Sequence, residues 1–140
     1  MAYSAHQAAR LTGCSPAQLS YWEHIGLVAP ADAEYSFRDL VALRVVASLL
    51  EAGLTLSRVR EAIRYLVASG EDIVGLRLVT DGDRVWACRD DGQILDALRR
   101  GQMALFVAVD AYAHEVDAQV RSFDAERQQF VDRLAASSDV

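Results

Sequence analysis

Apolar residues recur every three or four positions through the first half of the chain. Between residues 8 and 27 this spacing predicts two short helices around a tight turn at Gly13, because glycine best tolerates the left-handed conformation that follows a helix. Ser15 is expected to cap the second helix, and Pro16 suits its first position, where no amide hydrogen is needed. The pattern predicts a helix-turn-helix, whose second helix can enter a major groove. An αα-hairpin that only packs is the alternative.

Two further amphipathic helices are expected between residues 36 and 68. Ser36, with Asp39 three residues later, is a capping signal for the first of them, and Gly53 ends it. Thr55 is expected to cap the next helix. The inner face of that helix is predicted to be Leu56, Val59, Ile63, Leu66 and Val67. The predicted core of the helix-turn-helix comprises Leu19, Trp22, Ile25, Leu27, Leu40 and Leu43. The link before Ser36 has room for a small wing.

From Ser69 to about Asp91 the apolar period changes from 3.6 to 2, which predicts strands. Asp81-Gly82 is a preferred two-residue hairpin turn, and it would pair Leu78 with Val85 and Leu76 with Ala87. A lone hairpin is marginal in water, so it must dock onto a helix or onto a second hairpin across a dimer. A short element is expected from Ile94 to near Gly101.

The last segment is predicted to be one helix from about Gln102 to Ala136. Its apolar residues follow alternating steps of three and four, with Arg127 as the one interruption, which is typical of a coiled coil. We therefore expect a homodimer, with a long helix lying on its own domain as the alternative. The predicted dimerisation residues are Phe106, Val109, Ala113, Val116, Val120, Phe123, Phe130 and Leu134.

The fold class that follows is mainly α. Residues 1–68 would form a winged helix-turn-helix domain, 69–101 a segment containing a β-hairpin, and 102–140 a long dimerisation helix with a short tail. The 140 residues are 52% hydrophobic, which indicates a folded protein. The first residues lack the pattern of a signal peptide, and no apolar run is long enough to span a bilayer, so we expect a cytoplasmic protein without membrane contact. Cys14 and Cys88 are expected to be ordinary thiols.

The net charge of the chain does not show the basic excess that is usual for a DNA-binding protein. All 14 cations are arginine and the net charge is −6. Residues 1–68 have six arginines and six acidic residues, so the remainder, with eight arginines and 14 acidic residues, carries the whole excess. A DNA-binding protein usually shows a basic surface, because neutralising phosphates supplies much of its affinity. A neutral, solvated surface is the alternative for the first segment.

Several side chains of the predicted helix-turn-helix suit DNA contact. Gln18 can pair bidentately with adenine, Tyr21 can donate to a phosphate, and Ser15 can act with its helix N-terminus. The candidate DNA-binding residues are Arg10, Ser15, Ala17, Gln18, Ser20, Tyr21, Tyr35 and Arg38. The sequence contains no recognisable catalytic motif, because the three histidines are scattered and no glycine-rich phosphate-binding loop occurs. We expect no enzyme activity, cofactor or metal.

The chain also shows an ordered set of short motifs: Ala9 through Gly13, Leu19, Tyr21-Trp22-Glu23, Ile25-Gly26-Leu27, Tyr35-Ser36, Asp39-Leu40, Leu43-Arg44, Gly53-Leu54-Thr55-Leu56 and Val59-Arg60-Glu61. With these motifs, about half of the protein resembles the DNA-binding domain of the MerR family of winged-helix bacterial regulators. The resemblance implies a four-helix winged domain, a following coiled coil and a homodimer that binds palindromic promoter DNA. It also implies that Glu23 pairs with Arg44 across the helices.

Two departures from the MerR pattern concern DNA contacts. Ala17 and Ser20 stand where family members usually carry arginines, and Ala33 and Glu34 replace the arginines of the wing. The stretch from Gly75 to Ala108 is loosely similar to helix-turn-helix proteins of the toxin–antitoxin type.

Three hypotheses on function follow from the sequence. The first is a dimeric DNA-binding regulator with residues 15–24 as its recognition helix. The second is a protein-interaction module, antitoxin-like or an assembly factor, that acts through the hairpin and coiled coil. The third is a ligand-gated sensor, with Trp86, Phe106 and Tyr112 lining a pocket.

Overall fold

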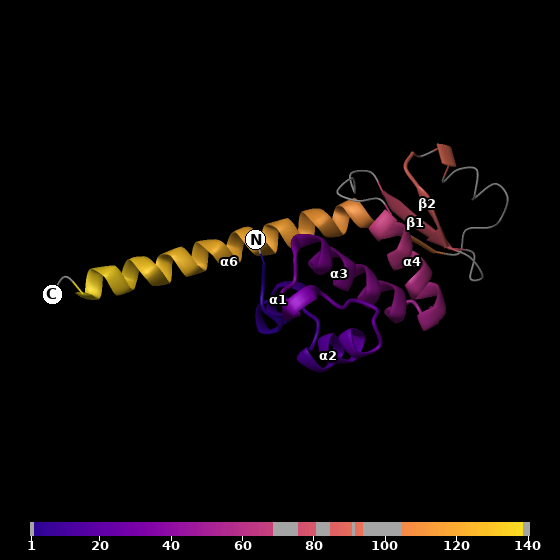
Figure 1. Cartoon of the computed structure of the whole chain (residues 1–140). Helices are drawn as coiled ribbons and strands as arrows, with labels where there is room; N and C mark the ends of the chain where they lie inside the picture. The colour runs from indigo at the N-terminus through magenta and orange to yellow at the C-terminus, as the bar shows by residue number, and fades with distance from the viewer. Residues whose placement is uncertain (1, 69–75, 81–84, 91, 94–104, 139–140) are drawn as a thin grey trace.

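The computed structural model describes residues 2–68, 76–80, 85–90, 92–93 and 105–138. The N-terminal domain consists of helices α1 (Ala5–Thr12), α2 (Pro16–His24), α3 (Phe37–Glu51) and α4 (Leu56–Ala68), with the short 3-10 helix η1 (Ala31–Ala33) in the link after α2. In place of a wing hairpin, this link makes one antiparallel bridge between Tyr35 and Tyr3. The predicted helix-turn-helix arrangement of α1 and α2 is confirmed (Figure 1).

The predicted helix boundaries are set by local capping. Gly13 ends α1 with φ +76°, in the left-handed region that glycine tolerates best. Ser15 caps α2 and Ser36 caps α3, each in a reciprocal capping box with the residue three positions later. These contacts are confined to four neighbouring residues, which explains why the sequence alone predicts them.

α3 lies at the centre of the domain, and its side chains are buried on most sides. The predicted core is confirmed for Leu19, Trp22, Leu27, Leu40 and Leu43, whereas Ile25 is half-buried. The predicted inner face of α4 is wrong at two positions. Leu56 is 38% and Val67 64% exposed, while Val59, Ala62 and Leu66 are buried. At 3.6 residues per turn, Leu56 and Val67 lie roughly a quarter turn from the centre of this buried stripe.

The predicted hairpin belongs to a three-stranded antiparallel sheet. Its strands are β1 (Arg77–Thr80), β2 (Val85–Cys88) and β3 (Leu105–Ala108), in the order β2-β1-β3. The predicted register is wrong by two residues, because Leu78 pairs with Ala87 and Thr80 with Val85. A shift of two keeps every side chain on its predicted face, since strand side chains alternate. The expected turn at Asp81-Gly82 and the element at 94–101 lie outside the described residues.

The sheet docks on a helix, as one of the two predicted alternatives requires. β2 contacts α4, and β1 contacts the start of the last helix, α6 (Val109–Ser138). Leu76, Leu78 and Val85 thereby join the core of the N-terminal domain. The sheet therefore extends the core of residues 2–68 and does not form a separate unit.

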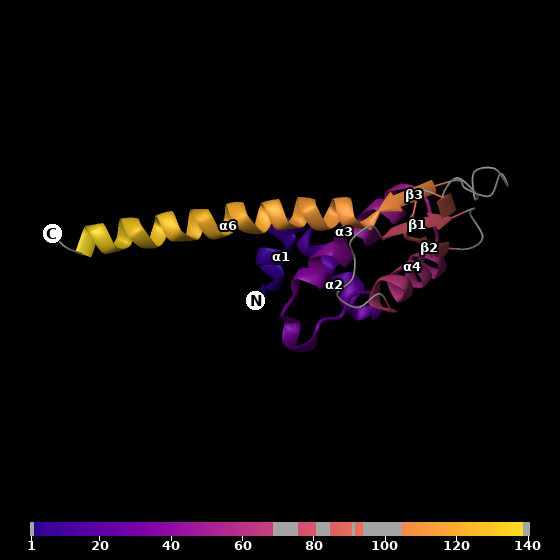
Figure 2. The same cartoon turned by 90° about the horizontal axis from the view of Figure 1, so that it is seen from above.

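The last helix begins later than predicted. Residues 105–108 form β3, in which Phe106 pairs with Val79, so Phe106 is not a heptad position of a helix. An apolar run with a high strand propensity lies beside the open edge of β1, and this tertiary pairing overrides the helical period. α6 then crosses α3 and α1, and its C-terminal half extends past the domain (Figures 1 and 2).

The apolar stripe of α6 has two different environments. Val109, Val116 and Phe123 are buried in the chain's own core, and Ala113 and Val120 pack against it. This half of the stripe agrees with the alternative of a helix lying on its own domain. Further along, Phe130 is 59% and Leu134 55% exposed. Among the described residues, no helix is long and apolar enough to cross a membrane.

Candidate nucleic-acid interface

The exposed face of α2 is the centre of the candidate interface. Leu19 and Trp22 anchor the helix in the core, with 1% and 4% exposure. The other side presents Ala17, Gln18, Ser20 and Tyr21 to solvent. α2 lies on the side of the domain away from α6 (Figure 1), so α6 does not cover this face. The geometry leaves the predicted recognition helix accessible along its polar side.

The capping box at the start of α2 restrains two of the candidate residues. The backbone N–H of Gln18 donates to Ser15 Oγ over 3.1 Å, and the Ser15 N–H donates to Gln18 Oε1 over 2.9 Å. The carboxamide oxygen of Gln18 is thus engaged, and its NH₂ group remains as a donor. In this conformation Gln18 offers a base edge a donor and keeps its acceptor in the cap.

Replacing Ser15 by alanine tests the cap. The substitution removes the acceptor for the Gln18 N–H, and we expect the free energy of unfolding to fall by about 1 kcal/mol. Urea unfolding followed by circular dichroism measures this loss. Ser20→Ala, on the exposed face of the same helix, is the control and should change stability by less than about 0.5 kcal/mol. Equal losses in the two variants would contradict a capping role.

Three of the predicted DNA-contacting residues are engaged or buried within the protein itself. Arg38 donates from Nη2 to the carbonyl oxygens of Leu66 and Val67, over 2.9 and 3.1 Å, and so caps the end of α4. Arg10 forms an ion pair with Glu126 of α6. Tyr35 is fully buried. The structure thus groups Ser15, Ala17, Gln18, Ser20 and Tyr21 at the cap and on the exposed face of α2. The other three candidates have partners or positions within the chain: Tyr35 in the core, Arg38 at the end of α4, and Arg10 in an exposed ion pair.

Tyr35 carries a buried hydroxyl without a hydrogen-bond partner in the described structure. Burial raises the pKa of this phenol, and the carboxylates of Glu23 and Asp39 raise that pKa further. Because the folded-state pKa lies above the unfolded value, Tyr35 contributes stability below pH 10 that is lost as the pH rises through its folded pKa.

Tyr35→Phe is expected to stabilise the protein by about 1 kcal/mol at pH 7, since it removes an unpaired polar group from the core. Above pH 10 the variant should lose less stability than the wild type, because one of the phenols with a raised pKa is gone. Urea unfolding at pH 7 and pH 10.5 checks both expectations. Tyr21→Phe, whose hydroxyl is exposed, should follow the wild type at both pH values, and destabilisation by Tyr35→Phe at pH 7 would reveal a hidden hydrogen bond.

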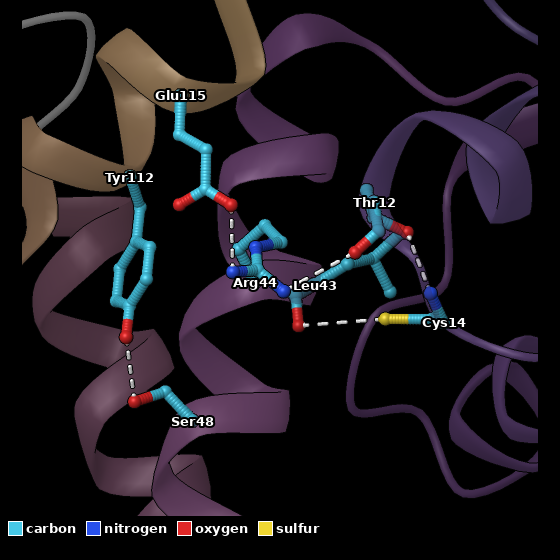
Figure 3. A network of polar contacts seen from close by, with 7 residues as sticks. All are labelled: Thr12, Cys14, Leu43, Arg44, Ser48, Tyr112 and Glu115. Carbon is cyan, nitrogen blue, oxygen red and sulfur yellow. Dashed lines mark hydrogen bonds and ion pairs between the residues drawn. The ribbon is translucent and has the colours of Figure 1, made fainter. Parts of the chain in front are cut away.

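The expected ion pair between Glu23 and Arg44 is wrong. Arg44 donates from Nη2 to Glu115 Oε1 of α6 over 2.8 Å and from Nη1 to the carbonyl oxygen of Thr12 over 3.3 Å (Figure 3). Its guanidinium carbon lies 5.3 Å from the centre of the Tyr112 ring. α6 supplies both the carboxylate and the ring, and the position of α6 on the domain depends on contacts that are distant in sequence.

Two arginines of α4 lie beside the C-terminal end of α2. Arg60 donates to the carbonyl oxygen of Ile25, directly after α2. Arg60 and Arg64 line a groove of about 330 Å³ together with Gly26, Leu27, Ile63 and Val67. Sequence reasoning did not select these two arginines as site residues. Their spacing of four on the outer face of a helix was visible, but only the packing of α4 against the link brings them next to α2.

Both cysteines are free thiols, in agreement with the prediction of ordinary thiols, and both are buried. Burial raises the pKa of both thiols. Each thiol is therefore protonated at neutral pH, which disfavours reactivity and metal binding. Within the described residues no group of three or more histidine, cysteine or acidic side chains is placed to hold a metal ion.

Comparison with known proteins agrees with this geometry. Residues 3–66 match the family model described as the MerR HTH family regulatory protein. The N-terminal domain is of the MerR type. The matched residues include the whole helix-turn-helix and most of α4, and therefore both α2 and the two arginines beside it.

The relatives extend the similarity beyond the MerR-type domain. Uncharacterised HTH-type transcriptional regulators of Mycobacterium bovis and of two strains of Mycobacterium tuberculosis are each 29% identical to this chain over 147 aligned positions. The alignments cover 98% of this chain and 65% of each relative. This chain thus spans slightly less than two thirds of the length of these relatives. The sheet and α6 are part of the similarity, together with the MerR-type domain.

Proposed function

We propose that this protein is a DNA-binding transcriptional regulator that acts as a homodimer and places α2 in a major groove. The observation that carries the proposal is the exposed polar face of α2 within a MerR-type domain. The relatives that bear the name of HTH-type transcriptional regulators support it. In this proposal Gln18 and Tyr21 contact the DNA directly, and Ser15 places the N-terminus of α2 near a phosphate.

The arginines of α4 are proposed to supply the positive charge that α2 lacks. Arg60 and Arg64 are exposed beside the end of α2, where they can neutralise phosphates that flank the groove. Two such contacts in each protomer give a smaller set than a strongly basic domain would provide. We therefore propose specific binding of moderate affinity, which weakens with salt along a shallow slope.

The second copy is proposed to bind the C-terminal half of α6. Phe130, Val131 and Leu134 are each more than half exposed. They belong to the C-terminal half of α6, which extends beyond the domain (Figure 2). Phe130 and Leu134 are four residues apart, so they share one face of the helix. Two such helices that pack together would hide these side chains from water and set the distance between the two α2 helices.

The experiment that tests the proposal measures fluorescence anisotropy on labelled DNA from upstream of the protein's own gene, across a salt series. The wild-type protein should bind this specific fragment saturably, and more tightly than it binds a random fragment. Gln18→Ala and Tyr21→Ala should each weaken binding to the specific fragment by about tenfold, the worth of a good base or phosphate contact. Arg60→Gln with Arg64→Gln should weaken binding to both fragments and flatten the salt slope by about four, two for each protomer of the dimer.

One observation supports a second candidate function. Residues 69–140 have eight arginines and 14 acidic residues, a balance that suits a basic protein partner better than DNA. In this alternative the sheet and α6 bind the partner and DNA binding is weak. Wild-type binding that is equal on specific and random DNA, and unchanged in the α2 variants, would favour the protein partner.

A further inference from the structure

The polar contacts around Arg44 connect the last helix to the turn of the helix-turn-helix. Arg44 lies on α3 and contacts both α6 and the end of α1 (Figure 3). One donor of its guanidinium reaches Glu115 of α6, and the other reaches the carbonyl oxygen of Thr12, the last residue of α1. The guanidinium group is rigid and planar, so its two donors keep a fixed geometry.

The turn that Arg44 contacts sets the angle between α1 and α2. Thr12 precedes Gly13, whose left-handed conformation reverses the chain, and the N–H of Cys14 donates to Thr12 Oγ1 over 3.3 Å. The thiol of Cys14 points to the carbonyl oxygen of Leu43, the residue before Arg44 (Figure 3). The turn is thus held to α3 at Leu43 and Arg44, directly ahead of the cap of α2.

On the other side, α6 is fixed to the sheet. β3 continues into α6 without a linker, and the N–H of Val109 donates to the carbonyl oxygen of Leu76 over 3.0 Å. Tyr112 stacks on the Arg44 guanidinium and donates its hydroxyl to Ser48 Oγ over 2.8 Å. The first two turns of α6 therefore bring the sheet, Tyr112 and Glu115 together as one side of the contact.

We propose that Arg44 is a positioning residue, which transmits displacements of the sheet and of the start of α6 to the turn before α2 and so adjusts DNA affinity. The inference rests on the proposed DNA-binding function. Any partner or ligand that moves the sheet would move Glu115 with it, because no flexible link separates them. Depending on that movement, Arg44 keeps or loses its hydrogen bond to the Thr12 carbonyl oxygen, and the position of α2 becomes more or less restrained.

A matched pair of variants on α6 tests the proposal. Glu115→Ala removes the carboxylate that holds Arg44. Asp117→Ala, the control, removes the same charge two residues further on and breaks an ion pair with Arg121 that stays within α6. The two side chains are about equally exposed, at 49% and 46%, so each substitution removes one negative charge from a similar environment. Glu115→Gln retains an acceptor for Arg44 and should fall between wild type and Glu115→Ala.

Two measurements on the full chain decide the outcome. In hydrogen exchange without DNA, Glu115→Ala should accelerate exchange at residues 12–15, and Asp117→Ala should not. In the anisotropy assay, Glu115→Ala should weaken specific binding about fivefold relative to Asp117→Ala, within the range seen for residues that couple distant sites. A purely structural ion pair would lower the melting temperature of both variants without changing their relative affinity.

The failures are distinguishable. Equal affinities of the two variants, in a protein whose wild type binds DNA, overturn the coupling and leave the proposed function intact. Unchanged exchange at residues 12–15 in Glu115→Ala overturns the coupling whatever the DNA result. If the wild type does not bind DNA specifically, the proposed function fails, and the effect on affinity proposed for Arg44 fails with it.

Discussion

Replacing Phe130 and Leu134 together by glutamate is expected to convert the protein from a dimer to a monomer. The two side chains are 59% and 55% exposed on the half of α6 that extends beyond the domain. In the proposed dimer each would bury apolar surface worth about 1.5–3 kcal/mol, and the glutamates would instead place like charges against each other. We expect the dimer dissociation constant to rise at least about 100-fold.

Sedimentation velocity over a concentration series measures this change directly. The wild type should show twice the 15.4 kDa mass of the chain, and the double variant the mass of a single chain. The control is Leu56→Glu with Val67→Glu, which makes the same kind of change at two exposed apolar residues of α4. This control should remain a dimer. A wild type that is monomeric at high concentration would exclude the proposed dimer outright.

The loss of the dimer should carry over to DNA binding. A dimer presents two α2 helices to two half-sites, so the second contact forms at a high effective concentration. We therefore expect the double variant of α6 to bind a palindromic fragment about 100-fold more weakly than the wild type. Binding to a fragment with one half-site should change little, because no residue of the α2 face is altered.

The elements that the sequence predicted well are those whose determinants lie within a few residues. Ser15, Gly13 and Ser36 set helix ends through contacts with residues at most four positions away. The buried pair Leu19 and Trp22 follows from the helical period. The exposed face of α2, and with it most of the candidate site, could therefore be predicted from the sequence.

The features that the sequence did not predict depend on tertiary contacts. β3 forms because residues 105–108 lie beside the open edge of β1, which removes Phe106 from the heptad pattern. Arg44 pairs with Glu115, 71 residues away, because α6 crosses α3, and no local pattern distinguishes this pair from the one expected with Glu23. Arg60 reaches α2 through the carbonyl of Ile25 for the same reason.

The apolar stripe of α6 shows why one pattern can have two structural outcomes. Heptad spacing predicts that one face of a helix is buried, but it does not indicate whether that face packs on the same chain or on a second copy. Val116 and Phe123 are covered by the chain's own core, whereas Phe130 and Leu134 continue the same stripe past the end of the domain. The alternative of a helix on its own domain therefore holds for the first half of α6, and the coiled coil stays a proposal for the exposed second half.

The second large effect is expected from one substitution made at two places on α4. Leu66→Ala removes a side chain that is 2% exposed in the core between α3 and α4, whereas Leu56→Ala removes one that is 38% exposed at the start of the helix. We expect Leu66→Ala to lower the free energy of unfolding by about 3 kcal/mol, through lost burial and the cavity left behind. Leu56→Ala should cost less than about 1 kcal/mol.

Urea unfolding compares the two variants at one fixed protein concentration, so that dimerisation contributes equally to the apparent stability of both. The comparison tests the rotation of α4, because the sequence pattern placed both leucines on the inner face and the structure separates them. Equal losses of stability in the two variants would indicate that Leu56 is also buried. α4 would then be rotated away from the orientation in which Arg60 and Arg64 lie beside α2. Unequal losses in the expected direction would support the orientation of α4 on which the proposed phosphate contacts depend.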